Sequence, residues 1–351
     1  MVTYAPAELE TAAAIPALNA LLGVMGRQYM HYAITVLDAF GPDGEATVRA
    51  HLRQFGRWRG TEMREAHHAM GRPVDMQSLT CLWDNASTYV IEDDMAAGSY
   101  DPDDSRFDVH FCPAALAWKD AGFHRWGHVY CDEFHQACAS SYHPDGTVVI
   151  PINMMKGDDR CAFRWVMPAT ARTLELGPPS ELGLRLARTY DAATPGRGAV
   201  NAMLRTSRLI GGCYVTMARP LVERHPGQAD VVLSRFLQAW SDDRGRLMRE
   251  RDLAAGLPLS AERFVRGLDL CPLQAWDADV VRLEPDHVEL VVRDTPMDQA
   301  WQDYDEAAIA RRFWEETFPA VAAAYDPGVV AELPELRWRG DPATRLVVRS
   351  A

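Results

Sequence analysis

The sequence predicts an α+β fold made of two tandem copies of one domain, each a helical hairpin followed by an antiparallel sheet. Three observations predict it. The chain has 351 residues, which is enough for two domains; two stretches of sequence recur in the same order; and each copy has helical periodicity before its strand-like segments. Helices followed by hairpin strands within one unit are typical of α+β proteins, not of wound parallel sheets.

The internal repeat appears in two registers. Residues 59–73 align without gaps on residues 244–258, and eight of these fifteen positions are identical. In a second register, residues 112–163 align on residues 295–346 and match Trp118 with Trp301, Asp120 with Asp303, Tyr142 with Tyr325, and Gly157 with Gly340. Chance would hardly produce both matches in the same order, so we interpret the chain as a duplication.

The boundary between the copies is expected in a stretch rich in Pro and Gly. We predict a first domain at residues 1–170, a linker at residues 171–199 with a short helix near residues 181–190, and a second copy at residues 200–351. The second copy is expected to be degenerate, with a structural or regulatory role.

Local patterns predict the elements of the first copy. Apolar periodicity predicts helices over residues 18–37 and 46–70, the second closed by Gly71 and stopped by Pro73. The remaining elements are, in order, a strand at 106–112, a helix of about 18 residues, a β-rich run at 147–155, a Gly-Asp turn and a strand at 161–167. The matching strand of the second copy is expected at 287–293.

Charge and hydropathy narrow the classes of partner. The chain has 36 Lys+Arg against 49 Asp+Glu, a formal net charge of −13, and the arginines are scattered among acids. Such a surface repels phosphate backbones, so we expect no nucleic-acid partner. No stretch approaches the roughly 20 apolar residues of a membrane span, and the apolar segment at residues 12–25 is a poor signal peptide. We therefore expect a cytoplasmic protein that acts on a small-molecule substrate, with a homodimer as a candidate assembly.

Thiols and imidazoles are concentrated in the first half. Five of the seven cysteines precede residue 162, and nine of the eleven histidines precede residue 144. No spacing resembles a disulfide scaffold or a paired CxxC zinc site. At 100° per residue, the helix expected near residues 124–142 places a stripe of imidazoles and thiols within an arc of roughly 80°. Its members are His124, His128, Cys131, His135, Cys138 and Tyr142.

The second copy serves as an internal control for this stripe. At the matching positions it has Ala307, Arg311, Trp314, Phe318, Val321 and Tyr325. Cys112 is matched by Thr295 and Cys161 by Thr344, so these thiols are lost as well. The scaffold residues persist while the reactive ones do not, which predicts one working site, in the first copy.

Three interpretations of the stripe remain open. In the first, Cys131 is a nucleophile and His135, one turn later, is its base; a nearby imidazolium would lower the thiol pKa. In the second, His128, Cys131 and His135, with Cys112 or Cys161, bind Zn²⁺ that activates a water. In the third, the thiols and histidines are structural, because buried cysteines behave as small hydrophobes.

These residues also carry a family resemblance. The motifs are Cys-Pro at 112–113, Gly-x-x-Tyr-Cys-Asp-Glu at 127–133, Tyr-x-Pro-Asp at 142–145 and Lys-Gly-Asp-Asp-x-Cys-x-Phe at 156–163. Together they resemble the L-2-amino-thiazoline-4-carboxylate hydrolase family over residues 107–166. The resemblance implies hydrolytic opening of a small ring and points to Cys112, Cys131 and Cys161. His135 stands where the resemblance leads us to expect an acidic residue.

We therefore predict a cysteine-dependent hydrolase of a small cyclic C–N or C–S substrate in specialised metabolism. The alternatives are a ring-forming or rearranging enzyme that uses the same groups, and a non-catalytic sensor of a small molecule or metal. No cofactor is expected, with Zn²⁺ as the alternative. The predicted catalytic residues are Cys131, His135, His128 and Asp159, and the predicted substrate-binding residues are Cys112, His124, Cys161, Tyr142 and Trp126.

Overall fold

The computed structural model describes residues 2–4, 11–85, 98–171, 174–190, 195–270 and 273–350. These residues form two compact units. The N-terminal unit comprises Leu9–Ala33 and Phe40–Thr206, and the C-terminal unit comprises Met1–Glu8, Ile34–Ala39 and Ser207–Ala351. Among the helices described, none is both long and apolar enough to cross a bilayer.

The described part of the N-terminal unit contains two long helices, four shorter α-helices and a four-stranded sheet. Its elements are α1 (Thr11–Phe40, to residue 33), α2 (Pro42–Ala69), α3 (Met76–Cys81), β2 (Ser99–Tyr100), β3 (Asp104–Val109), α5 (Pro113–Asp120), α6 (His124–Tyr142), β4 (Thr147–Ile152), η1 (Met154–Lys156), β5 (Cys161–Val166), α7 (Glu181–Ala187), η2 (Arg188–Tyr190) and the start of α8.

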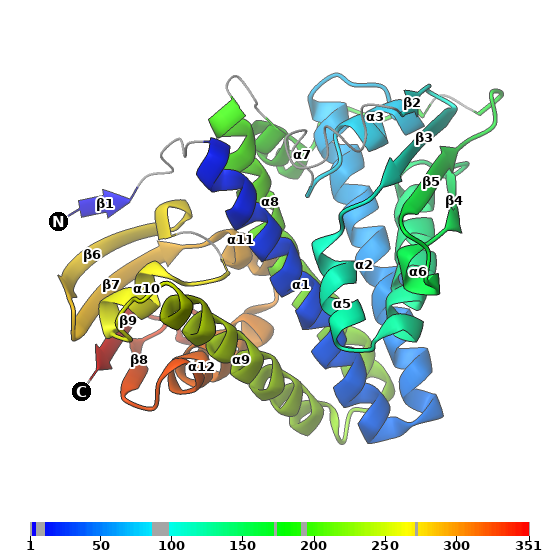
Figure 1. Ribbon diagram of the computed structural model, residues 1–351. Coiled ribbons are helices and arrows are strands. Elements are labelled where there is room, and N and C mark those ends of the chain that lie inside the picture. The colour runs from blue at the N-terminus through cyan, green and yellow to red at the C-terminus, as the bar shows by residue number, and fades with distance from the viewer. Residues whose placement is uncertain are drawn as a thin grey trace. The chain divides into compact units, whose positions relative to one another are not determined.

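The N-terminal unit is layered as sheet, α6 and α2. The sheet is antiparallel in the order β2-β3-β5-β4, and α6 packs on β4 and η1 (Figure 1). Helix α2 packs on the other side of α6 at close range, because it presents glycines there. A Cβ added at Gly60 would lie 2.3 Å from the carbonyl oxygen of Cys138, and one added at Gly56 would lie 2.3 Å from that of Phe134.

The C-terminal unit has the same order of elements. These are α8 (Pro195–Arg224, from residue 207), α9 (Ala229–Ala254), α10 (Ala261–Arg266), η3 (Leu273–Ala275), β6 (Asp277–Glu284), β7 (His287–Asp294), α11 (Pro296–Asp303), α12 (Ala307–Tyr325), β8 (Val329–Glu335), η4 (Arg337–Arg339) and β9 (Thr344–Ser350). Its antiparallel sheet runs β1-β6-β7-β9-β8, with β1 (Val2–Tyr4) at the edge. The order β6-β7-β9-β8 parallels β2-β3-β5-β4.

Buried contacts recur in the two units at matched positions. The Trp118 indole donates to the carbonyl of Gly26 at 2.8 Å, and the Trp301 indole donates to that of Gly211 at 3.1 Å. The Arg59–Asp84 and Arg244–Asp269 ion pairs are likewise matched. The α+β prediction is confirmed, and these paired contacts fit the tandem arrangement.

The element boundaries differ from the predicted ones for local reasons. Strand β3 ends at Val109 rather than residue 112, because Cys112 is the N-cap of α5 and Pro113 is its first residue. Gly71 adopts a positive φ of 68° after α2, as its predicted role at the helix end requires. The predicted linker contains α7, η2 and the start of α8; its residues 172–173 and 191–194 lie outside the described residues. The domain boundaries themselves remain a prediction.

Candidate active site

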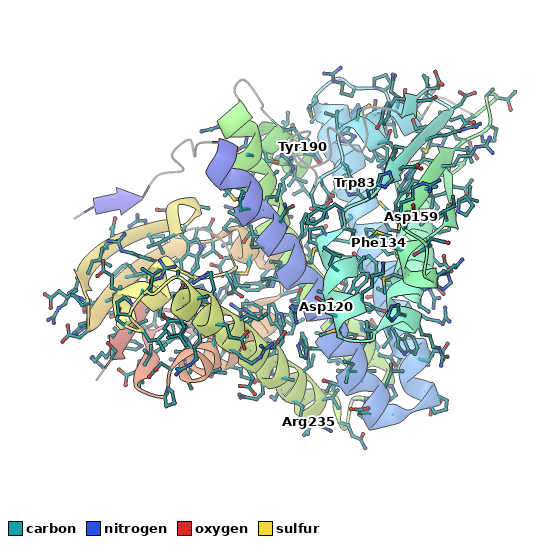
Figure 2. The ribbon with its side chains drawn as sticks, in the orientation of Figure 1. Trp83, Asp120, Phe134, Asp159, Tyr190 and Arg235 are labelled. Carbon is teal, nitrogen blue, oxygen red and sulfur yellow. The ribbon has the colours of Figure 1, made fainter. Side chains whose placement is uncertain are left out.

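A cavity of about 170 Å³ opens in the N-terminal unit between α5, α6 and the sheet. Residues of α1, α2, α3, β3 and η1 complete its lining. A large part of the wall is aromatic, contributed by Trp83, Phe107, Phe111, Trp118, Tyr130, Phe134, Phe163 and Trp165. The rings of Trp83 and Phe134 meet edge to face, with centroids 6.5 Å apart (Figure 2). An apolar, concave site with few polar groups is typical of a small-molecule pocket.

Four of the predicted site residues line this cavity: Cys112, Cys131, His135 and Cys161. Cys131 and His135 lie one turn apart on α6, as the helical period requires. Cys112 reaches the cavity as the N-cap of α5, and Cys161 as the first residue of β5, opposite Val109 of β3. Residues from three separate elements are thus gathered around one space.

His135 is held as a neutral imidazole by its surroundings. Its Nδ1 lies 2.8 Å from the carbonyl oxygen of Cys131, which only accepts, so Nδ1 carries the proton and donates it. Burial lowers the pKa of His135 to about 4, and the Arg59 guanidinium contributes to the lowering. The Nε2 atom is therefore unprotonated at neutral pH and is able to accept a proton.

The thiols of the cavity are also neutral. Burial raises the pKa of Cys131 well above its ordinary value, and the neighbouring Cys161 and Cys112 raise it further. Burial likewise raises the pKa of Cys161 to about 11 and raises that of Cys112. The expectation that an imidazolium lowers the pKa of Cys131 is therefore wrong, because His135 is uncharged and its Nδ1 binds the backbone.

Asn153, which the sequence did not single out, organises the thiol end of the cavity. It is fully buried, and its Oδ1 accepts from the backbone N–H of Met155 at 2.8 Å. The same oxygen lies 4.0 Å from Cys161 Sγ, and this sulfur accepts from the backbone N–H of Met154 at 3.3 Å. In the part of the chain that the structure describes, no group of three His, Cys, Asp or Glu has the arrangement of a metal site.

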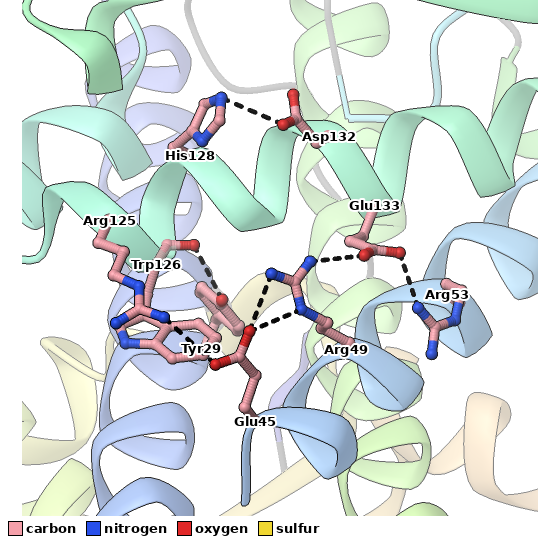
Figure 3. A network of polar contacts seen from close by, with 9 residues as sticks. All are labelled: Tyr29, Glu45, Arg49, Arg53, Arg125, Trp126, His128, Asp132 and Glu133. Carbon is pink, nitrogen blue, oxygen red and sulfur yellow. Dashed lines mark hydrogen bonds and ion pairs between the residues drawn. The ribbon is translucent and has the colours of Figure 1, made fainter. Parts of the chain in front are cut away.

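The other two predicted catalytic residues do not line the cavity. His128 Nε2 lies 3.1 Å from Asp132 Oδ2 on the same helix, and Figure 3 shows this pair on the side of α6 opposite Glu133. Asp159, labelled in Figure 2, has a side chain that is 77% exposed. It pairs with Arg160 at 3.1 Å. Neither group is in position to touch a ligand that occupies the cavity.

The remaining predicted binding residues also lie elsewhere. His124 is exposed at the start of α6. The Trp126 indole packs under the Arg125 guanidinium, and its carbonyl accepts from the Tyr29 hydroxyl at 3.0 Å (Figure 3). Tyr142 is fully buried, with its hydroxyl 2.9 Å from His67 Nδ1 on α2. His124, Trp126 and Tyr142 therefore lie on or beside the face of α6 that carries Cys131 and His135. They do not lie on the part of the helix that borders the cavity.

A buried cation is the main cavity residue that sequence reasoning missed. Arg59 of α2 is 1% exposed, and its Nε donates to Asp84 Oδ2 at 2.9 Å while its Nη2 binds Asp84 Oδ1. Although burial lowers the pKa of Arg59, the adjacent Asp84 carboxylate outweighs it and raises the pKa above the ordinary value. The guanidinium packs on the rings of Phe134 and Trp83 at 4.8 and 5.2 Å. The one available signal was the identity of Arg59 with Arg244 in the repeat.

The corresponding space in the C-terminal unit is filled. Trp314 and Phe318 of α12 match Cys131 and His135, and their rings stack with centroids 4.4 Å apart. Trp276 packs against both, and all three are buried. The thiols and the imidazole thus line a cavity where the other copy has aromatic core.

The comparisons with known proteins bear on the unit that holds the cavity. Residues 24–165 match the family model described as L-2-amino-thiazoline-4-carboxylic acid hydrolase. No curated protein and no solved structure matches the chain. The matched segment contains Cys112, Cys131, His135, Cys161 and Arg59. This match to the L-2-amino-thiazoline-4-carboxylic acid hydrolase family over residues 24–165 confirms the family resemblance that the sequence motifs indicated.

Proposed function

We propose that the cavity of the N-terminal unit is the active site of a cysteine-dependent hydrolase that opens a small ring at a C–N or C–S bond. One observation carries the proposal: Cys131 and His135 line the same cavity, and their counterparts in the C-terminal unit are the buried rings of Trp314 and Phe318. The family match supports hydrolysis as the reaction class.

In the proposed reaction, the sulfur of Cys131 attacks the electrophilic C=N or C=O carbon of the ring. His135 Nε2 takes the thiol proton as the new C–S bond forms, which gives a tetrahedral adduct. The adduct then expels the ring nitrogen or sulfur, and His135 returns the proton to this leaving group. Water attacks the carbon bound to Cys131, and the sulfur leaves as the regenerated thiol.

The protonation states of His135 and Cys131 determine how the proton must move in this sequence of steps. A neutral imidazole with a pKa of about 4 is available as a base across the physiological range. The Cys131 thiol has a raised pKa and stays protonated until attack, so the proposal requires proton transfer and attack together. The hydrogen bond from Nδ1 to the carbonyl of Cys131 fixes the ring so that Nε2 is the free nitrogen.

Cys112 and Cys161 are assigned to substrate binding in this proposal. The Cys161 sulfur accepts a backbone hydrogen bond from Met154, so one of its lone pairs is engaged. Cys112 lies at the N-terminus of α5 without a side-chain cap bond. We assign no step to His128 or Asp159, because both lie outside the lining of the cavity.

Turnover by single-thiol variants tests the proposal. With L-2-amino-thiazoline-4-carboxylic acid as the probe, Cys131→Ser should lower kcat by at least a thousandfold. Cys138→Ser is the matched control, because Cys138 is a buried thiol on the same helix that does not line the cavity. Equal activity in the two variants would remove Cys131 as the nucleophile. No turnover by the wild-type protein would exclude this substrate, and other thiazolines and cyclic amidines would then be assayed.

A further inference from the structure

Asn153 is a buried amide with one end that the fold leaves unused. Its Oδ1 accepts from the backbone N–H of Met155 at 2.8 Å, which fixes the orientation of the amide and puts Nδ2 on its other branch. Among the residues that the structure describes, this Nδ2 has no hydrogen-bond partner, although it is buried. An amide nitrogen carries two N–H donors, and burying them unpaired costs free energy. Packing alone therefore does not account for an asparagine at this position.

The turn that carries Asn153 forms without an amide in the C-terminal unit. Asn153 is the N-cap of η1, with φ −145° and ψ 120°, and the matching Leu336 is the N-cap of η4, with φ −140° and ψ 115°. Leu336 makes no side-chain cap bond, yet both turns end at a glycine with positive φ. Asp158 and Asp341 accept from the N–H of the two N-cap residues at the same distance, 2.7 Å. The scaffold thus accepts leucine as well as asparagine at this position.

The amide occurs in the unit that has the thiols, and it lies beside them. Leu336 stands for Asn153 in the unit where Trp314 stands for Cys131. Asn153 Oδ1 lies 4.0 Å from Cys161 Sγ, and η1 packs on α6, the helix of Cys131. Burial raises the pKa of Cys131, whereas the Asn153 side chain lowers it. The amide is therefore near enough to Cys131 to favour its thiolate, while Nδ2 is not yet held by a formed hydrogen bond to a described residue.

The titratable groups around Cys131 do not favour a negative charge on its sulfur. Thiols and a carboxylate among them raise the Cys131 pKa, and His135, with a pKa of about 4, is neutral at neutral pH. These groups are Cys112 of α5, Cys161 of β5, Tyr29 of α1, and Asp132 and His135 of α6. None of them is positively charged at neutral pH, so a sulfur that becomes negative depends on hydrogen-bond donors.

We propose that Asn153 is a positioning residue for the nucleophile, and that its Nδ2 donates a hydrogen bond to the Cys131 sulfur as this sulfur takes on negative charge. This inference rests on the proposed function and adds a residue to it. The charge develops when the thiol proton passes to His135 Nε2, and again when the sulfur leaves the carbon at the end of the reaction. A hydrogen bond to a charged sulfur is stronger than one to a neutral thiol, so Nδ2 stabilises the transition state more than the resting protein.

Alkylation of Cys131 tests this role without turnover. Asn153→Leu introduces the residue of the second copy, and Asn153→Ser keeps an oxygen that can cap η1 but lacks the amide donor. Iodoacetamide labels the full-length protein at mildly alkaline pH, and peptide mass analysis gives the rate at Cys131 relative to the exposed Cys81. We expect both variants to lower this relative rate at least tenfold, because the thiolate reacts and loses a hydrogen bond. Cys161 accepts from the backbone of Met154 and should change less than threefold.

Kinetics give a second readout, with a control in the other unit. With L-2-amino-thiazoline-4-carboxylic acid as the probe, both Asn153 variants should lower kcat at least tenfold. They should change KM less than threefold, because Asn153 does not line the cavity. Leu336→Asn makes the reverse exchange in the C-terminal unit and should change neither kcat nor the labelling of Cys131.

Three results would overturn the proposal: unchanged labelling of Cys131 in both variants, an equal loss at Cys131 and Cys161, or wild-type labelling in Asn153→Ser, which would reduce Asn153 to a helix cap. Should Asn153→Leu fail to fold, Asn153→Ser decides. Wild-type labelling in the Asn153 variants with an inactive Cys131→Ser would contradict this inference alone. A selective loss of labelling with an active Cys131→Ser would contradict the proposed function alone.

Discussion

Trp314 occupies the position on α12 that Cys131 occupies on α6, and its indole stacks on Phe318, the counterpart of His135, with ring centroids 4.4 Å apart. Both rings are buried, and the Trp314 N–H donates to Asp298 at 3.0 Å. A thiol and an imidazole are smaller than an indole and a phenyl ring, so the same scaffold encloses a cavity in the N-terminal unit and a packed core in the C-terminal unit.

Removal of the Trp314 ring should therefore affect stability and not chemistry. Trp314→Ala leaves a cavity and removes one of the hydrogen bonds to Asp298, which keeps its bond from the Trp338 indole. We expect it to lower the free energy of unfolding by about 3–5 kcal/mol. Urea denaturation measures this loss. The ring-opening activity per folded molecule should stay unchanged, and a selective loss of activity in a stable variant would show that the C-terminal unit takes part in the reaction.

Close packing of α2 on α6 predicts a contrast between two glycine substitutions. Gly60→Ala places a Cβ 2.3 Å from the carbonyl oxygen of Cys138, so the helices must separate. We expect a loss of about 1–3 kcal/mol in thermal or urea unfolding. Gly23→Ala on α1 meets nothing within 4 Å and should instead gain about 0.5–1 kcal/mol. Equal effects of the two changes would contradict this packing.

Acidification should destabilise the protein through His67 and His135. Burial lowers the pKa of each to about 4, from an ordinary value of 6.5. Between these values the unfolded chain binds protons that the folded protein does not. The contribution of the two histidines to the free energy of unfolding is therefore fully present above about pH 6.5. It falls as the pH drops toward 4, by up to about 1.4 kcal/mol per pH unit for each histidine.

The variant His135→Phe introduces the residue that the second copy has at the matching position, Phe318. It removes one of the two histidines that take up a proton on unfolding. We expect its unfolding free energy to fall less steeply between pH 6.5 and 4 than that of the wild type. The difference in slope corresponds to the uptake of up to one proton on unfolding. Urea titrations at several pH values measure the slope. Identical slopes in the two proteins would show that His135 titrates normally in the folded state.

Alkylation should distinguish the neutral thiol of Cys131 from a thiolate. Because burial raises the pKa of Cys131, iodoacetamide should modify it slowly at neutral pH, and the exposed Cys81 should react first. Peptide mass analysis after timed quenching gives the order. His135→Phe should abolish turnover without shifting the pH dependence of this alkylation. Rapid labelling of Cys131 near pH 6 would indicate a thiolate–imidazolium pair.

The sequence predicted positions around the axis of α6 better than positions along it. The 3.6-residue period placed Cys131 and His135 on one face, and both line the cavity. His124 and Tyr142 share that arc but lie at the two ends of the helix, one exposed and the other packed on His67. Periodicity fixes the angle of a side chain, whereas the part of the helix that borders a cavity depends on elements packed against it.

Long-range pairing explains the residues that the sequence did not reveal. Arg59 becomes a cavity residue because Asp84, after α3, holds its guanidinium, and no local pattern joins the two positions. Asn153 reaches Cys161 only through the turn at η1. By contrast, the Gly-Asp turn before β5 is predicted by a local pattern, and the second copy has the same turn. The carboxylate of Asp158 in this turn accepts from the N–H of Asn153 at 2.7 Å, and that of the matching Asp341 accepts from the N–H of Leu336 at 2.7 Å.

The most direct test of the account is to find the residue that carries the substrate during turnover. The wild-type protein is mixed with L-2-amino-thiazoline-4-carboxylic acid, quenched in acid within the first turnover and digested, and its peptides are weighed. We predict a peptide that contains Cys131 with an added mass from the substrate, and its absence in Cys131→Ser. An adduct on Cys112 or Cys161, or continued turnover by Cys131→Ser, would contradict the assignment of Cys131 as the nucleophile.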